Sequence, residues 1–251
     1  MHELKRNEIH FFYTCLDGII DKTLLQRYRA VINEKEGAKV DRYVFEKDKR
    51  CCLVTRALQR FVLSLFTKKA CKNFEFVDNE FGKPFLKPGT LNPPIEFNLS
   101  HSGNLTGCAL TLDREIGMDI ENIIRKIDLA IAHRFFSKAE SDYLKNIPVK
   151  HVSEVFFDFW TLKESYIKAK GMGLSIGLDK FTFKLDQEKI GVDFDESLQE
   201  VSNQWRFVKF SPLENYKVAI SIRANPDTHL KLHIYNCIPF GEIKTQGTMV
   251  F

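Results

Sequence analysis

The chain has 251 residues, of which 44% are hydrophobic and 28% are charged. These values exclude a disordered chain and are typical of a globular protein with a substantial core, arranged as one large domain or two small ones. The formal net charge of +4 is too small to favour general nucleic-acid binding, but it suits an anionic small ligand or an acidic protein partner.

The first half of the chain alternates between strand-like and helix-like patterns. Apolar and aromatic runs predict strands at residues 9–15, 74–77, 95–100 and 107–112. Helical spacing predicts a first helix that either Asp21 or Thr23 would cap and that Gly37 interrupts. A longer helix is expected from about Lys47 to Phe66, with an apolar core face and basic flanks.

The second half begins after a turn at Asp113 and Arg114. Its first strand reads EIGMDIE, at residues 115–121, and a helical section follows at 127–144. Pro148 breaks that pattern before the aromatic-rich helix VFFDFWTLKESYIKAK, at residues 155–170, which Gly171 and Gly173 end. Strands are expected at 180–185, 205–210 and 218–223, with a polar loop at 193–203. The mixture predicts an α+β fold with subdomains 1–113 and 114–251, each holding strands and one long helix.

The cysteines and the start of the chain favour a cytoplasmic location. The six cysteines include no CxxC pair and no grouping with histidine at zinc spacing, which fits a reducing compartment. The opening residues, MHELKRNEIHFFYTC, lack the apolar core of a signal peptide, and no apolar run is long enough to cross a bilayer. We therefore expect neither a membrane nor a nucleic acid as a partner.

Acidic residues in the second half form the main candidate site. Asp119 and Glu121 alternate with apolar residues in the 115–121 strand, so their side chains share one face. In the following helix, Glu164 and Lys168 continue a mostly apolar line through Trp160. One interpretation is an exposed Glu–Lys pair beside a core helix. The other is that three acids and a lysine converge.

A convergent set would suit a divalent metal and a phosphate ligand. Carboxylate oxygens are hard ligands that favour Mg²⁺, and Mg²⁺ prefers few carboxylates together with phosphate oxygens and water. Lys168 would meet the same phosphates, and one carboxylate would accept a proton from an attacking hydroxyl, directly or through water. The spacing leaves open which carboxylate does so.

Candidate anion ligands in the first half have simpler explanations as well. Ser100 and His101 end the 95–100 strand next to Gly103, where backbone donors and an imidazole would suit an anion, or where a serine-rich turn would form. Lys83 projects from a turn, and residues 34–50 mix acids with bases. From the residues alone, a turn at 100–103 and a solvated surface at Lys83 and 34–50 are the favoured interpretations.

Several motifs together resemble one family in both order and spacing. They are FNLSHSG at 97–103, IGMDIE at 116–121, RFFSKAE at 134–140 and FWTLKESYIKAKGMGL at 159–174, with FGKP at 81–84 and the basic stretch at 35–50. This combination resembles the Sfp-type 4′-phosphopantetheinyl transferases over most of the chain. The resemblance implies transfer of the phosphopantetheine arm of coenzyme A to a serine hydroxyl of an apo acyl or peptidyl carrier protein. Adenosine 3′,5′-bisphosphate is the implied second product, and Mg²⁺ the implied cofactor.

The resemblance also implies roles for individual residues. The implied metal ligands are Asp119, Glu121 and Glu164. The implied catalytic residues are Glu164, the leading candidate to deprotonate the carrier serine, and Lys168. The implied contacts to coenzyme A are Lys35, Arg50, Lys83, Ser100, His101 and Lys168. Ala38 departs from the family pattern, since relatives commonly have a basic residue there, although Lys39 is adjacent.

The implied architecture is a pseudo-dimer of two similar α+β subdomains with the active site in the cleft between them. Coenzyme A contacts would come from 1–113, and the metal site and carrier docking from 114–251. A monomer is expected, because the second subdomain replaces a second chain. The alternatives are a Mg²⁺-dependent coenzyme A phosphohydrolase and a non-catalytic module that binds coenzyme A or a carrier. The sequence does not identify the carrier.

Overall fold

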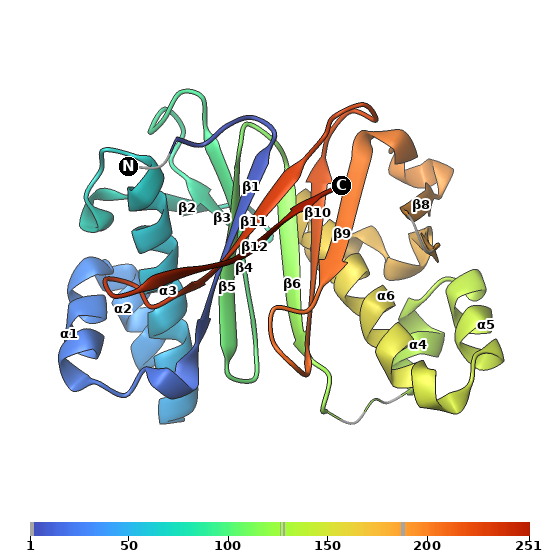
Figure 1. Cartoon of the computed structure of the whole chain (residues 1–251), viewed down its shortest axis with the longest axis horizontal. Coiled ribbons are helices and arrows are strands. Elements are labelled where there is room, and N and C mark those ends of the chain that lie inside the picture. Colours follow the sequence, from blue (N-terminus) through green and yellow to red (C-terminus); the bar gives the residue numbers. More distant parts are fainter. Residues whose placement is uncertain (1–2, 126, 128, 187–188) are drawn as a thin grey trace. The chain divides into compact units, whose positions relative to one another are not determined.

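A computed structural model of the chain describes residues 3–125, 127, 129–186 and 189–251, and it has the predicted α+β fold (Figure 1). The helices are α1 (Lys22–Val31), α2 (Glu34–Asp41), α3 (Glu46–Phe66), α4 (Leu129–Phe135), α5 (Lys138–Asn146) and α6 (Val149–Lys170). The strands up to the middle of the chain are β1 (Glu8–Cys15), β2 (Phe76–Asp78), β3 (Pro84–Leu86), β4 (Ile95–Ser102), β5 (Leu105–Leu112) and β6 (Ile116–Asn122). The later strands are β7 (Phe181–Leu185), β8 (Ile190–Phe194), β9 (Trp205–Phe210), β10 (Tyr216–Arg223), β11 (Lys231–Cys237) and β12 (Ile243–Val250).

The chain forms two compact units, each of which is discontinuous in sequence. Unit 1 contains the residues up to Asp78, Pro84–Asp113 and His229–Val250, and unit 2 contains Asn79–Lys83, Arg114–Thr228 and Phe251. The chain passes from unit 1 to unit 2 after Asp113, the position of the expected boundary. The C-terminal strands differ from the expected 114–251 subdomain, because β11 pairs with β1 and therefore belongs to unit 1.

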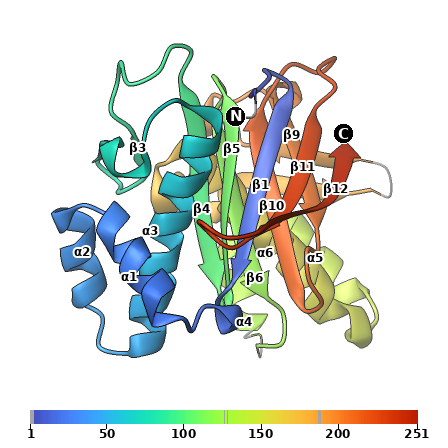
Figure 2. The ribbon, with the colours of Figure 1, turned by 60° about the vertical axis from the view of Figure 1, so that its left-hand side comes forward.

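Unit 1 is built on a five-stranded sheet in the order β12-β11-β1-β5-β4 (Figure 2). Strand β1 is antiparallel to β5 and parallel to β11. Helix α3 buries Leu58, Val62 and Leu63 against apolar side chains of the sheet, while Val54 and Ala57 of the same helix pack against α1. The core of unit 1 thus lies between this helix and the sheet.

The break between α1 and α2 differs from the predicted one. Gly37 was expected to interrupt the helix, but it lies buried inside α2. The break falls at Ile32 and Asn33, where the Asn33 side chain accepts a hydrogen bond from the Glu36 amide and the Asn33 N–H donates one to the Glu36 carboxylate. This capping box starts a new helix before the glycine is reached. At α1, Asp21 is the N-cap.

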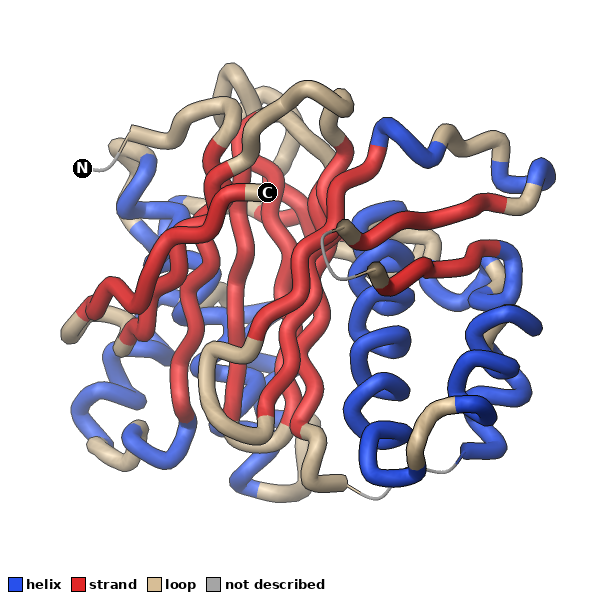
Figure 3. Tube along the Cα trace, turned by 45° about the vertical axis from the view of Figure 1, so that its right-hand side comes forward, coloured by secondary structure: helices blue, strands red, loops and turns tan. Residues whose placement is uncertain are grey.

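Unit 2 is built on a three-stranded sheet, β6-β10-β9, with the long helix α6 packed against β6 and β10 (Figure 3), and it also contains α4, α5 and the two-stranded sheet β7-β8. Helix α6 begins directly after Pro148 and ends at Gly171, whose φ of 66° is left-handed. Its aromatic residues account for much of the core, in a cluster that includes Phe156, Phe157, Phe159, Tyr166, Phe181 and Trp205. The helical section expected at 127–144 is two helices, α4 and α5, and residue 128 lies outside the described residues.

A buried ion pair anchors α6 from its other side. The Lys163 ammonium lies 2.8 Å from Glu140 Oε2, and both side chains have no exposed surface. Lys163 also donates to the carbonyl oxygens of Leu178 and Phe181, while Glu140 accepts from the Phe183 amide. The pair is therefore fully hydrogen-bonded, which is the condition under which a buried charge is tolerated.

Within the described ranges, no helix is both long enough and apolar enough to cross a bilayer.

Candidate functional site

Strand β6 and helix α6 come into backbone contact at Gly117. A β-carbon on residue 117 would lie 2.1 Å from both the Ser165 carbonyl oxygen and the Ala169 nitrogen. Only glycine fits at this separation. The Ser165 hydroxyl, 2.6 Å from the Ser221 hydroxyl of β10, adds a second polar contact between the helix and the sheet. Gly117 therefore sets the close approach that places the next acidic residues of β6 over α6.

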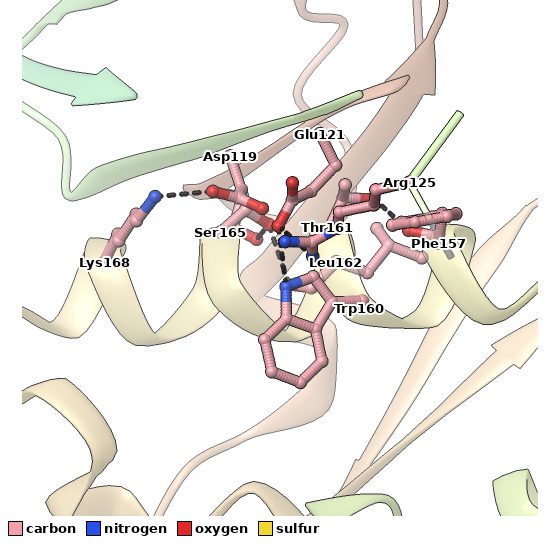
Figure 4. A network of polar contacts seen from close by, with 10 residues as sticks. Asp119, Glu121, Arg125, Phe157, Trp160, Thr161, Leu162, Ser165 and Lys168 are labelled. Atoms are coloured by element: carbon pink, nitrogen blue, oxygen red, sulfur yellow. Dashed lines mark hydrogen bonds and ion pairs between the residues drawn. The ribbon is translucent and has the colours of Figure 1, made fainter. Parts of the chain in front are cut away.

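Asp119 and Lys168 form an ion pair across this junction (Figure 4). The Lys168 ammonium lies 2.5 Å from Asp119 Oδ1, and Asp119 is only 4% exposed. A carboxylate from β6 and an ammonium from the last turns of α6 thus share one partly buried position.

Glu121 lies on the same face of β6 and has two donors of its own. Its Oε1 accepts from the Trp160 indole N–H at 3.0 Å and from Arg125 Nη2 at 2.8 Å. Sequence reasoning placed Trp160 on the line of Glu164 but gave neither Trp160 nor Arg125 a role. A partly buried indole N–H needs a hydrogen-bond acceptor, so the sequence could have predicted a polar partner for Trp160.

Burial and neighbouring charges perturb the acidity of Glu164. Burial is the main cause that raises its pKa from 4.5 to about 6, and the neighbouring charge of Asp119 raises it further. Lys168 opposes the shift, and Glu121 adds a smaller upward effect. At neutral pH the group is still ionised, but it is a stronger base than an ordinary carboxylate. These electrostatic couplings show that Asp119, Glu121, Glu164 and Lys168 lie together.

The donor chemistry of this cluster fits Mg²⁺, although the oxygens do not form a closed cage. Among the described residues, the acids of unit 2 make no set of three ligand atoms within 4.8 Å of one another. Lys168 and Arg125 instead bind Asp119 and Glu121. Mg²⁺ usually takes one or two carboxylates and fills its other positions with water and phosphate oxygens. The hard carboxylate oxygens of Asp119, Glu121 and Glu164 are compatible with that requirement.

Unit 1 contains a cavity of about 380 Å³ with cationic walls. Its lining includes Lys39, Lys47, Arg56 and His101, together with the half-buried Cys52. Only His101 was predicted as a ligand contact, while Lys39 is the residue beside the Ala38 departure. Cations on α2 and α3 and the His101 imidazole on β4 line one hollow, which makes it suitable for phosphate groups.

The other predicted contacts to coenzyme A in unit 1 lie elsewhere. Lys35 is exposed and pairs with Asp78 at 3.3 Å. Arg50 lines a different cavity, next to α1. Ser100 is buried at 4% exposure and does not line the cationic cavity. The structure therefore groups His101 with cations that sequence reasoning did not select, and the roles of Lys35, Arg50 and Ser100 stay predictions.

Lys83 belongs to unit 2 and binds the end of α6. Its ammonium donates to the Ala169 carbonyl at 2.8 Å and to the Ile116 carbonyl at 3.2 Å. Nearby, the Asn79 side chain donates to the Gly171 carbonyl at 2.7 Å. A cation at a helix C-terminus satisfies terminal carbonyls and stabilises the helix dipole. This contact gives Lys83 a structural task, and its contact to coenzyme A stays a prediction.

Comparisons with known proteins agree on one family for both units. A family model described as the 4′-phosphopantetheinyl transferase superfamily matches residues 115–221, and one described as 4′-phosphopantetheinyl transferase, N-terminal, matches residues 21–112. The chain is 29% identical to 4′-phosphopantetheinyl transferase HetI of Nostoc sp., over 87% of this chain and 89% of the relative. It is 33% identical to 4′-phosphopantetheinyl transferase Sfp of Bacillus subtilis, over 68% of this chain and 75% of the relative. The corresponding values for 4′-phosphopantetheinyl transferase psf-1 of Bacillus pumilus are 34%, 69% and 72%. With these matches and with the Sfp-type motifs on β4, β6 and α6, the chain belongs to the 4′-phosphopantetheinyl transferase family.

Proposed function

We propose that this chain transfers the 4′-phosphopantetheine arm of coenzyme A to a serine hydroxyl of an apo acyl or peptidyl carrier protein. Adenosine 3′,5′-bisphosphate is the second product. Family membership supports the reaction class. The observation that carries the proposal is Glu164, whose pKa is raised to about 6 beside Asp119 and Lys168.

In this proposal Glu164 is the general base. It accepts the proton of the carrier serine, directly or through one water, while the serine oxygen bonds to the phosphorus that bears the pantetheine arm. The bond from that phosphorus to the bridging oxygen breaks, and the electron pair leaves with adenosine 3′,5′-bisphosphate. A base whose pKa lies between that of an ordinary carboxylate and neutral pH is both ionised and more basic, which suits the step.

Asp119, Glu121 and Glu164 are the residues that would hold Mg²⁺ in this reaction. When bound, Mg²⁺ would neutralise charge on the pyrophosphate and stabilise the leaving group. Lys168 supplies a second cation at the same place, since its ammonium already binds Asp119. Trp160 and Arg125 orient Glu121 through the hydrogen bonds described above.

Coenzyme A is the proposed co-substrate, and unit 1 supplies phosphate contacts. His101, Lys39, Lys47 and Arg56 around the cationic cavity support this part of the proposal. The contacts of Lys35, Arg50, Lys83 and Ser100, carrier docking by residues 114–251 and a site in the cleft between the subdomains stay predictions, as does a monomer. The six cysteines are free thiols, which supports a reducing cytoplasm as the place of the reaction.

Intact-protein mass spectrometry tests the reaction directly. The chain is incubated with coenzyme A, Mg²⁺ and a panel of apo acyl and peptidyl carriers, and one phosphopantetheine is expected on at least one carrier. A carrier with its acceptor serine changed to alanine, and a reaction with a chelator, should show no addition. Failure with every carrier, while circular dichroism shows a folded chain, would contradict the proposal. Free phosphopantetheine formed without a carrier would indicate a phosphohydrolase, and coenzyme A binding without turnover would indicate a binding module.

A further inference from the structure

Three potential metal ligands meet on the sheet of unit 1, and none of them belongs to the acidic cluster of unit 2. Glu8 and His10 are two residues apart on β1, so their side chains share one face of the strand. His233 on β11 lies directly opposite His10 in the parallel pairing of the two strands, which Figure 2 shows side by side. The backbone register therefore brings a carboxylate and two imidazoles onto one surface patch of the sheet.

The atoms that could bind a metal lie close together. His10 Nε2 lies 3.5 Å from Glu8 Oε2, and His233 Nε2 lies 3.8 Å from Glu8 Oε1. The three ligand atoms are all within 4.8 Å of one another. Ligands at 2.0–2.2 Å from a tetrahedral Zn²⁺ are roughly 3.4 Å apart, so ligand atoms that lie within 4.8 Å of one another would have to approach by up to about 1.4 Å to hold the ion.

Neighbouring hydroxyl groups contact Nδ1 of each imidazole, so Nε2 is the nitrogen left for a metal. The Tyr235 hydroxyl lies 3.3 Å from His10 Nδ1, and the Thr248 hydroxyl lies 3.1 Å from His233 Nδ1. Each ring therefore uses Nδ1 for a hydrogen bond and directs Nε2 toward Glu8. Metal-binding histidines commonly have such a partner on the second nitrogen, which fixes the orientation of the ring.

From this geometry we propose that Glu8, His10 and His233 form a binding site for a transition-metal ion, with Zn²⁺ the best fit. Two imidazoles and one carboxylate are a Zn²⁺ ligand set, whereas Mg²⁺ prefers all-oxygen coordination. The side chains of Glu8 and His233 are 15% and 23% exposed, so the ion has access and water completes its coordination. His10, at 5% exposure, gives the site a rigid base.

The site would tie β1 to β11, whose residues are more than two hundred positions apart in the chain. Such a link stabilises the folded state by mass action, since a metal that binds the native ligand set but not the unfolded chain raises the melting temperature. The proposal does not depend on the transferase reaction, because its residues share nothing with Asp119, Glu121 and Glu164.

Co²⁺ and Zn²⁺ titrations of the untagged full-length chain, after treatment with a chelator, test this site. Excess Mg²⁺ is present throughout to occupy hard-oxygen sites. We expect one equivalent of Co²⁺ to give visible absorption of a nitrogen-ligated four-coordinate ion, which Zn²⁺ then displaces. We also expect Zn²⁺ to raise the melting temperature, with saturation at one equivalent.

Variants identify the ligands. Glu8→Gln and His233→Gln should weaken Co²⁺ binding at least about tenfold, and Thr248→Val should weaken it less, as a residue that orients a ligand. His229→Gln removes an exposed histidine of unit 1, and Glu164→Gln removes an acid of unit 2, so both should bind as the parent chain does. Equal binding by the parent chain, Glu8→Gln and His233→Gln, all folded by circular dichroism, would overturn the proposal. So would absence of the four-coordinate spectrum in the parent chain.

Discussion

Gly117 passes so close to Ser165 that a β-carbon at residue 117 would lie 2.1 Å from the Ser165 carbonyl oxygen. Gly117→Ala must therefore push β6 away from α6, and we expect the free energy of unfolding to fall by about 3 kcal/mol. Transferase activity should fall with it, because the acids of β6 would move relative to Glu164. Urea denaturation measures the first effect. Gly18→Ala is the matched control, since a β-carbon there meets nothing within 4 Å. Equal stability of the two variants would show that the junction is not tight.

Glu164→Gln should reduce kcat for transfer by about 100-fold or more, the usual contribution of a general base. The amide keeps the shape of the side chain but cannot accept the serine proton. Isothermal titration should show that coenzyme A still binds. A kcat close to that of the parent chain would exclude Glu164 as the base and direct attention to Asp119 or Glu121.

The raised pKa of Glu164 also predicts how stability depends on pH in metal-free buffer. The folded-state pKa is about 6 and the reference value is 4.5. The folded chain therefore keeps the Glu164 proton to a higher pH than the unfolded chain does. The contribution of this proton to the free energy of unfolding is complete below pH 4.5 and is lost as pH rises through about 6. At pH 7, Glu164→Gln should be more stable than the parent chain by about 2 kcal/mol, and this gap should close toward pH 4. Denaturation curves across that range, with a chelator, measure the gap. If the difference in free energy of unfolding between Glu164→Gln and the parent chain does not change with pH, the raised pKa of Glu164 is not its cause.

Lys163→Ala should be strongly destabilising, by about 3–5 kcal/mol, because it leaves the buried Glu140 carboxylate without its cation. The double variant Lys163→Met with Glu140→Gln should lose less, since no charge then remains buried. Lys145→Ala serves as the control for an exposed pair, with an expected loss under about 1 kcal/mol. Similar losses for Lys163→Ala and Lys145→Ala would mean that the buried pair contributes no more than a surface one.

His101→Ala and Arg56→Ala should each raise KM for coenzyme A by about tenfold with little change in kcat, if phosphates occupy the cationic cavity. The effect should shrink at high salt, because screening weakens the interaction already in the parent chain. His229→Ala, which removes an exposed histidine outside the cavity, should leave KM unchanged. Unchanged KM in the first two variants would separate this cavity from coenzyme A binding.

The shared faces of the acidic residues were predictable, because two simple periodicities generate them. The alternation in β6 puts Asp119 and Glu121 on one face, and helical spacing puts Glu164 and Lys168 on one side of α6. These periodicities did not show how closely β6 and α6 approach each other. Gly117 permits the close approach, and a glycine inside a strand is a recognised sign of such a contact.

The unpredicted features depend on partners distant in the chain. No local pattern around His10 reveals His233, because the parallel pairing of β1 with β11 is a property of the fold. Similarly, the grouping of His101 with Lys39 and Arg56 depends on how α2, α3 and β4 pack. The error at Gly37 has a local cause instead. The glycine was expected to break the helix, but the Asn33 capping box four residues earlier determined the local structure more strongly.

The discontinuity of unit 1 has a consequence for folding during synthesis. As the chain leaves the ribosome, all of residues 114–228 emerge before β11, so unit 2 can fold while β1 still lacks one of its two neighbours. An unpaired strand edge is a template for association with other chains. A nascent chain arrested before Lys231 would therefore display the exposed edge of β1 beside an already folded insert, and chaperones that shield strand edges would act on it at that stage.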